Sequence, residues 1–238
     1  MKVLSIGDLH LPFHNKYYMR KLYKQIEKEQ PDVVIQDGDL YDQYLFSRHD
    51  SNLNIITPDE ELRRARKSAE YFWKRIQAIV PKAKCIQLLG NHDTRILRKA
   101  MRVFPEAYTI IHEAHNKLYT FENVETCYTD RDYVEYDGVV YCHGWMAKHH
   151  THFKKSVVRA HDHKAWMYIK GETSTFKGAM TIGSSYKIKR EEGLLFEISC
   201  GMYADESLLP FEYTSSKLNN WSPAISIVTK DYAELRIL

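Results

Sequence analysis

The sequence has 238 residues, 44% of them hydrophobic and 27% charged, which is ordinary for a globular α/β protein with a hydrophobic core. The net charge of +3, from 34 Lys and Arg against 31 Asp and Glu, neither requires nor excludes a nucleic-acid partner. The four cysteines form no CxxC pair, no signal-peptide pattern opens the chain, and no apolar run approaches a membrane span, so we expect a cytosolic protein with free thiols.

The first half alternates between short apolar runs and helical patterns. Residues 3–6, 33–35 and 85–89 read as buried strands. Residues 16–29 and 58–79 read as amphipathic helices, the second with Thr57 as its N-cap and Pro58 at its first position. This order predicts a parallel sheet with both faces covered, and such sheets bind ligands beyond the carboxyl ends of their strands.

The second half predicts further short strands. Residues 139–142 and 156–158 each run toward a histidine block, and residues 194–198 form another apolar run. Residues 171–193, rich in Gly, Ser, Thr and Lys, are typical of a mobile loop or an irregular hairpin. Residues 224–229 and 232–237 predict a closing hairpin. With no repeat and no linker, we expect residues 1–238 to form a single domain.

Five polar blocks stand at the ends of apolar runs. They supply the carboxylate, imidazole and amide groups that hold divalent transition metals. The blocks are Asp8-Leu9-His10, Gly38-Asp39-Leu40-Tyr41-Asp42, Gly90-Asn91-His92-Asp93, His143-Gly144 and His161-Asp162-His163. Taken singly, Asp8 and Asp39 could be turn residues, Asp93 an N-cap and His143 a core histidine. Their joint occurrence in this order favours a metal site.

These blocks resemble the calcineurin-like metallophosphoesterase family, whose pattern is D-x-H, G-D-x-x-D, G-N-H-[DE], H and G-H-x-H. The motifs span residues 8 to 163. The resemblance implies an α/β fold, a four-layer αββα sandwich of two mixed sheets flanked by helices. It also implies a phosphoesterase of class EC 3.1 that uses two divalent metals. Mn²⁺ is the expected metal, with Fe, Zn or Ni as alternatives.

The resemblance also assigns roles. One metal would be held by Asp8, His10, Asp39 and His163, and the other by Asp39, Asn91, His143 and His161. The shared carboxylate would offset the repulsion of two close cations, and a metal-bridging hydroxide would attack phosphorus. His92 would serve the leaving-group oxygen, oriented by Asp42. Arg95 and His14 are candidate substrate-binding residues.

One assignment has an alternative within the sequence. His150-Thr151-His152 is closer to the usual G-H-T-H than His161-Asp162-His163 is, but it follows His143 by only seven residues. We therefore favour His161 and His163. Ala160 stands where the family usually has Gly, so a tight turn of positive φ would be strained there.

The substrate has to be inferred from the residues around the predicted metal site. Residues 38–44 lack the Arg of the protein-phosphatase pattern G-D-x-V-D-R-G. A basic rim is predicted from Lys148, Lys154, Lys155, Arg159 and Lys164, which would suit an extended polyanion. The opening Ser5 to His14 and the Asn220-Trp221 pair resemble phage and prophage members described as DNA-exonuclease-like.

We therefore expect a phosphodiesterase acting on DNA, RNA or a nucleotide, with no membrane partner, in the host cytoplasm if phage-encoded. A phosphomonoesterase acting on a protein or a small molecule is the alternative. A non-catalytic metal-containing binding protein is the third reading. The sequence does not indicate an oligomeric state.

Overall fold

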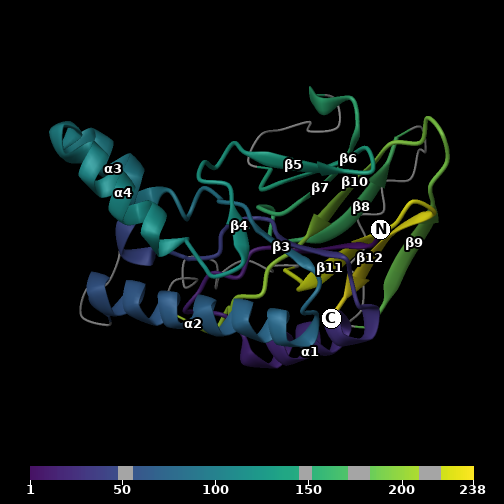
Figure 1. Cartoon of the computed structure of the whole chain (residues 1–238), viewed down its shortest axis with the longest axis horizontal. Helices are drawn as coiled ribbons and strands as arrows, with labels where there is room; N and C mark the ends of the chain where they lie inside the picture. Colours follow the sequence, from purple (N-terminus) through teal and green to yellow (C-terminus); the bar gives the residue numbers. More distant parts are fainter. Residues whose placement is uncertain (48–55, 145–151, 171–182, 209–220) are drawn as a thin grey trace.

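Two mixed β-sheets face each other at the centre of the protein, with helices outside them (Figure 1). The computed structural model describes residues 1–47, 56–144, 152–170, 183–208 and 221–238. The seven-stranded sheet has the order β4 (Val124–Thr126), β3 (Lys84–Gln87), β2 (Val33–Gln36), β1 (Val3–Ile6), β11 (Ala224–Val228), β12 (Tyr232–Ile237) and β9 (Ser185–Lys189). The five-stranded sheet has the order β5 (Tyr133–Tyr136), β6 (Val139–Cys142), β7 (Ser156–Arg159), β10 (Phe196–Cys200) and β8 (Ala165–Ile169).

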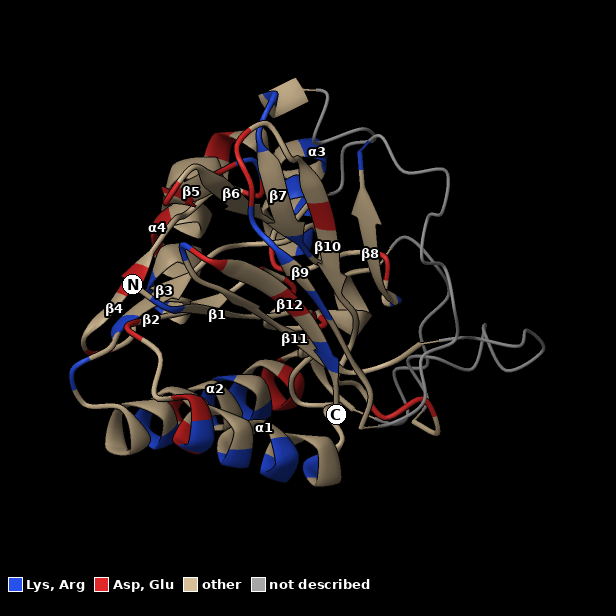
Figure 2. Cartoon of the chain, turned by 90° about the vertical axis from the view of Figure 1, so that its right-hand side faces the viewer, with Lys and Arg blue, Asp and Glu red and all other residues tan. Residues whose placement is uncertain are grey.

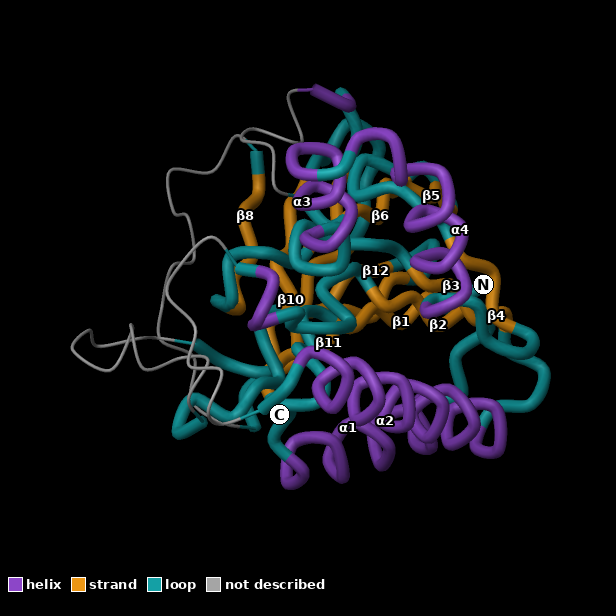
Figure 3. Tube along the Cα trace, turned by 90° about the vertical axis from the view of Figure 1, so that its left-hand side faces the viewer, coloured by secondary structure: helices purple, strands orange, loops and turns teal. Residues whose placement is uncertain are grey.

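Helices α1 (Lys16–Glu29) and α2 (Pro58–Ile79) lie along the outer face of the seven-stranded sheet, whereas α3 (Arg95–Val103) and α4 (Tyr108–Leu118) lie at one end of the molecule (Figures 1 and 3). Two 3-10 turns, η1 (Tyr44–Phe46) and η2 (Pro105–Ala107), complete the described helical structure. The predicted α/β fold with two mixed sheets and flanking helices is therefore confirmed. No helix among the described residues is both long and apolar enough to cross a membrane.

The strand–helix–strand prediction for the first half is also confirmed. Strands β1, β2, β3 and β4 pair in parallel, with α1 and α2 as the crossovers, and β11 closes the other side of β1 in antiparallel register. Helix α2 begins at the predicted cap, where the Thr57 hydroxyl accepts the Glu60 N–H at 3.3 Å. Because the first three strands are parallel, their carboxyl ends meet at one edge.

Two separate cores follow from the alternation of side chains along the strands. Leu4, Ile6 and Val34 point to the outer face and pack under the apolar stripes of α1 and α2, which include Trp73. Val3, Val33, Ile35 and Ile86 point the other way and meet the five-stranded sheet. The sheet that carries the first polar blocks is thus buried on both faces, as predicted.

Some local predictions were wrong. Strand β9 lies within residues 171–193, of which 171–182 are outside the described residues, and β10 begins two residues later than predicted. Thr94, not Asp93, is the N-cap of α3. Strands β4, β5 and β8 and helix α4 were not predicted. Strands β4 and β5 are short and only partly buried, so they give little periodic signal. All four cysteines are free, as expected.

Candidate metal centre

The polar blocks converge because each follows the carboxyl end of a strand. Asp8 and His10 follow β1, Asp39 follows β2, and Asn91 follows β3. The second sheet brings its own blocks to the same place through the parallel pair β6 and β7, which His143 and the pair His161 and His163 follow. The polar blocks, which lie between residues 8 and 163 in the sequence, therefore meet at one shared edge.

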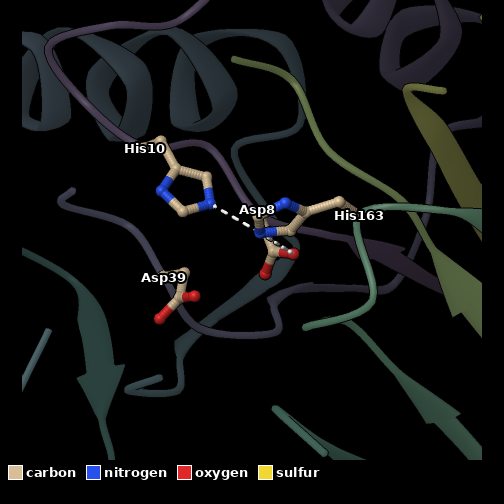
Figure 4. Close-up of side chains that lie close together, drawn as sticks. All are labelled: Asp8, His10, Asp39 and His163. Carbon is tan, nitrogen blue, oxygen red and sulfur yellow. Dashed lines mark hydrogen bonds and ion pairs between the residues drawn. The ribbon is translucent and has the colours of Figure 1, made fainter. Parts of the chain in front are cut away.

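One group of four predicted ligands comes together as expected from the sequence. Ligand atoms of Asp8, His10, Asp39 and His163 all lie within 4.8 Å of one another. Figure 4 shows the rings of His10 and His163 pointing at each other, with their Nε2 atoms 3.2 Å apart. The His163 Nε2 atom is also 3.7 Å from a carboxylate oxygen of Asp8. Two imidazole nitrogens and carboxylates around one point form the donor set of a transition-metal site.

The second group shares Asp39 with the first. Ligand atoms of Asp39, His143 and His161 lie within 4.8 Å of one another. The Asn91 Oδ1 atom lies 2.8 Å from His143 Nε2 and 2.8 Å from His161 Nδ1. The Asp39 Oδ2 atom lies 3.3 Å from the same His143 nitrogen. The structure thus gathers both predicted ligand sets around one common carboxylate, and His152 belongs to neither of them.

Outer contacts fix which nitrogen of each histidine faces the centre. His10 Nδ1 donates to the Asp42 carboxylate at 2.7 Å, so its Nε2 presents a lone pair. His143 Nδ1 donates to the Asp37 carbonyl at 3.1 Å, which turns its Nε2 lone pair toward the oxygens of Asn91 and Asp39. Lone pairs that face one another in a buried site call for a cation between them.

Asp42 contacts two histidines, of which the sequence predicted only one. As predicted, its Oδ1 atom lies 3.0 Å from Nδ1 of His92, the predicted leaving-group residue, whereas its contact with His10 was not predicted. A single carboxylate oxygen therefore orients His10 and His92 together. The other ring nitrogen of His92, Nε2, lies 2.8 Å from the Arg95 guanidinium, which also donates to the Asp42 carbonyl at 2.9 Å. Arg95 is thus placed against His92, inside the site.

Several ligand residues have strained backbones. His10, Asp39, His161 and His163 all have positive φ angles, of 50°, 51°, 75° and 59°. Non-glycine residues rarely take this conformation, and such residues cluster at functional sites. The positive φ falls on the two histidines rather than on Ala160, where the sequence had suggested it.

Gly38 lies where a side chain could not fit. It has a φ of 101°, and a Cβ there would lie 2.8 Å from both the ring of His143 and the Gly90 nitrogen. Glycine is therefore required before Asp39, because it lets the β2 loop pass close to the β3 loop.

The electrostatics of the cluster fit bound cations. Burial and the charge of Asp39 raise the pKa of Asp8 to about 7. Burial acts to lower the pKa of His143, but the charge and close contact of Asp39, together with the charges of Asp8 and Asp93, outweigh it and raise this pKa to about 9. Burial also acts to raise the pKa of Asp39, yet His143 and His92 hold it well below its usual range. The Asp39 Oδ2 atom is buried and forms no hydrogen bond among the described residues; its ion-pair contacts are with His143 Nε2 at 3.3 Å and His92 Nε2 at 4.0 Å. A buried carboxylate oxygen without a hydrogen bond, at the junction of both ligand groups, suits two metals that share Asp39.

Asp93 has a role different from the predicted N-cap. Its buried carboxylate accepts the backbone N–H groups of Gly90, Leu40 and Tyr41 at 2.8, 3.2 and 2.8 Å. These bonds tie the loop after β2 to the loop after β3. The position of Asp93 directly after the Gly90-Asn91-His92 block was the only signal of this role in the sequence.

Not every predicted site residue lies in the cluster. His14 lines a groove beside α1 and belongs to none of the ligand groups. The predicted basic rim is partly wrong, because Arg159 is buried and pairs with Glu197 and Asp162, and Lys155 pairs with Glu135. Lys148 and His150 lie outside the described residues.

A family model described as calcineurin-like phosphoesterase matches residues 1–168. The chain therefore belongs to the calcineurin-like phosphoesterase family, and its buried His/Asp cluster is a metal site of the dinuclear type. A comparison with curated proteins found no match.

Solved structures similar to this chain include the phosphoesterase YfcE from E. coli and two Vps29 proteins. The similarity to YfcE covers 96% of this chain and 88% of that chain, with 13% identity and a TM-score of 0.42. For Vps29 from Cryptosporidium parvum the values are 99%, 89%, 13% and 0.43. For a single mutant of Vps29 from Entamoeba histolytica they are 100%, 99%, 10% and 0.42.

Proposed function

We propose that this phosphoesterase hydrolyses phosphodiester bonds of nucleic acid. The observation that carries the proposal is the charge of α3, which starts at Arg95 directly beside His92. This helix carries Arg95, Arg98, Lys99 and Arg102 and no acidic residue. Lys99 and Arg102 are exposed, so they can contact phosphates that extend away from the metal centre. A small-molecule phosphomonoester would have no further phosphates to meet them.

The residues of the centre divide the work. Asp8, His10, Asp39 and His163 would hold one divalent cation, and Asp39, Asn91, His143 and His161 the other. When bound, the two cations supply Lewis-acid polarisation of the phosphate and a water acidic enough to be deprotonated near neutral pH. Mn²⁺ is the metal we propose, because mixed oxygen and nitrogen ligands accommodate it.

His92 is placed to serve the leaving-group oxygen. Its Nδ1 is occupied by Asp42, so its Nε2 is the atom that would carry the transferred proton. The Arg95 guanidinium now donates a hydrogen bond to that Nε2 atom, at 2.8 Å. A bound phosphate oxygen would offer the guanidinium a stronger, charged acceptor, and the move of Arg95 onto it would release Nε2.

The proposal is tested first with small substrates. Purified full-length protein is given Mn²⁺ and either bis-p-nitrophenyl phosphate or p-nitrophenyl phosphate, and its bound metals are counted. We expect preference for the diester. Preference for the monoester would identify a phosphomonoesterase, and two bound metals with no turnover would favour a binding protein.

The nucleic-acid part has its own test. The double variant Lys99→Glu/Arg102→Glu should raise the KM for a DNA or RNA oligonucleotide about tenfold or more, because two phosphate contacts become repulsive. Its hydrolysis of bis-p-nitrophenyl phosphate should stay unchanged. The double variant Lys74→Glu/Lys82→Glu, at exposed residues of α2 and of the turn before β3, is the matched control. An unchanged KM in the double variant would remove α3 from substrate binding. The exonuclease-like subtype and the cytoplasmic location stay predictions.

A further inference from the structure

A second candidate site, lined by basic rather than acidic residues, lies between α1 and α2. A cavity of about 740 Å³ opens between these helices. Both helices lie on the side of the seven-stranded sheet that faces away from the second sheet (Figure 1). The apolar lining of the cavity comes from Leu11, Met19, Phe72 and Ile79. We call this cavity the α1–α2 groove. Its size is in the range of pockets that hold small organic ligands.

Helical spacing places basic residues in a row on each wall of the α1–α2 groove. Residues three or four apart share one face of a helix. On α1 this row is Lys16, Arg20 and Lys24, and on α2 Lys67 and Arg75 flank Tyr71. Figure 2 shows the Lys and Arg positions along both helices. The groove is therefore a strip of apolar and aromatic surface between two cationic walls.

The positive charge of these walls is not neutralised by the protein. None of the five cations forms an ion pair or hydrogen bond with another group in the described part of the chain. By contrast, Arg66 on the same helix pairs with Glu70 at 2.8 Å. Glu27 is the one carboxylate among the described lining residues. Five cations against one acid in a concave site favour an anionic ligand.

Aromatic rings give the groove a second kind of contact. The rings of Tyr23 and Phe72 lie with their centroids 6.5 Å apart. Tyr71 and Arg75 lie close enough to Tyr23 to influence the pKa of its hydroxyl, which burial raises. Tyr71 itself is 64% exposed, so one face of its ring is open to a planar ligand. A base or another aromatic group could stack here, next to the cations.

We propose that the α1–α2 groove binds a nucleoside phosphate, with its base against the tyrosines and its phosphates between the cationic walls. The apolar floor favours a ligand with an aromatic part over inorganic phosphate alone. The limited size of the groove, about 740 Å³, favours a mononucleotide over a nucleic-acid strand. The site does not depend on the proposed nuclease activity, since none of its lining residues belongs to the metal-ligand groups.

The test measures binding to the full-length, metal-loaded protein by isothermal titration calorimetry. The probe is α,β-methylene ADP, whose phosphate–phosphate bridge resists hydrolysis, with inorganic phosphate and adenosine titrated separately. We expect Arg20→Glu and Arg75→Glu each to weaken one class of ADP-analogue sites about tenfold or more, because a contact becomes a repulsion. Tyr71→Ala should weaken the same sites while leaving phosphate binding unchanged. Asp39→Asn should leave them intact.

The control variants change lysines on the same two helices that do not line the groove. Lys74→Glu and Lys28→Glu change the net charge equally but do not line the groove. Equal weakening by these two variants, or no weakening by Arg20→Glu and Arg75→Glu, would overturn the proposal. Binding of inorganic phosphate as tight as the analogue would overturn the nucleoside part. If a single-stranded oligonucleotide competes tightly for the groove, the ligand is a nucleic-acid strand and the mononucleotide proposal is overturned. Hydrolysis of bis-p-nitrophenyl phosphate, measured in parallel, should be unchanged in the groove variants, so failure of one proposal is distinguishable from failure of the other.

Discussion

The metal centre and the α1–α2 groove share one loop, yet they are built from opposite charges. Asp8 and His10 of this loop belong to the centre, whereas Leu11 and His14 line the groove. The centre consists mainly of buried acids and imidazoles and attracts phosphate chiefly through cations that it binds first. The groove carries exposed Lys and Arg, which can meet phosphate directly. The first arrangement is rigid and desolvated, and the second is open to solvent and salt.

Removing the carboxylate that both ligand groups share should have the largest effect on the metal centre. Asp39→Asn should lower the metal content below two per chain and reduce diester hydrolysis by more than about 100-fold, beyond the usual cost of losing an outer contact. Elemental analysis and kcat measured at saturating Mn²⁺ check this. Two metals retained per chain would show that Asp39 does not bridge them.

The His92→Ala substitution separates metal binding from proton transfer. We expect turnover to fall about 100- to 10,000-fold, because a positioned acid contributes that much. The metal content should stay at two per chain, since His92 belongs to neither of the two groups that share Asp39. The loss should be smaller for p-nitrophenyl esters than for poor leaving groups such as alkyl esters. Equal losses for both kinds of ester would remove His92 from leaving-group chemistry.

The Asp42→Asn substitution tests whether one oxygen serves two histidines. It should weaken metal binding about 10- to 100-fold, as loss of an outer contact to a ligand histidine does. It should also lower turnover at saturating metal, because the acceptor of His92 loses the negative charge that stabilises its protonated ring. Metal titration and kcat are measured on one preparation. A change in turnover with metal affinity unaltered would confine Asp42 to His92.

We expect salt to have the smallest effect, and to affect ligand binding in the groove more than hydrolysis at the metal centre. Raising the ionic strength from 50 to 200 mM should weaken the binding of α,β-methylene ADP to the groove by about threefold or more, because exposed charges are screened. Hydrolysis of bis-p-nitrophenyl phosphate should change by less than about twofold, because buried pairs are screened much less. Equal salt dependence of both would contradict the distinction drawn between the two sites.

The sequence predicted the parts of the protein in which local pattern and topology agree. Buried strands such as Val3–Ile6 and the long amphipathic helix after Thr57 have strong periodic signals, and parallel pairing then brings their ends together. All seven predicted ligands lie in the cluster for this reason. Their metal-binding roles stay predictions until metals are measured.

Features that depend on long-range contacts could not be predicted. The basic residue Arg159 looked like part of a rim, but its neighbours in space include Glu197, 38 positions away. The second contact of Asp42 depends on how the loop after β1 folds back on the loop after β2. The α1–α2 groove depends on the packing of two helices that the sequence describes only one at a time.

The single oxygen of Asp42 that holds both His10 and His92 has a consequence for anyone redesigning this enzyme. A change made at His10 to favour another metal will move or free Asp42, and so alter His92, the residue proposed to serve the departing alcohol. With these proposed roles, metal preference and the range of alcohols released are linked traits. Variants selected for one should drift in the other unless position 42 is optimised together with position 10.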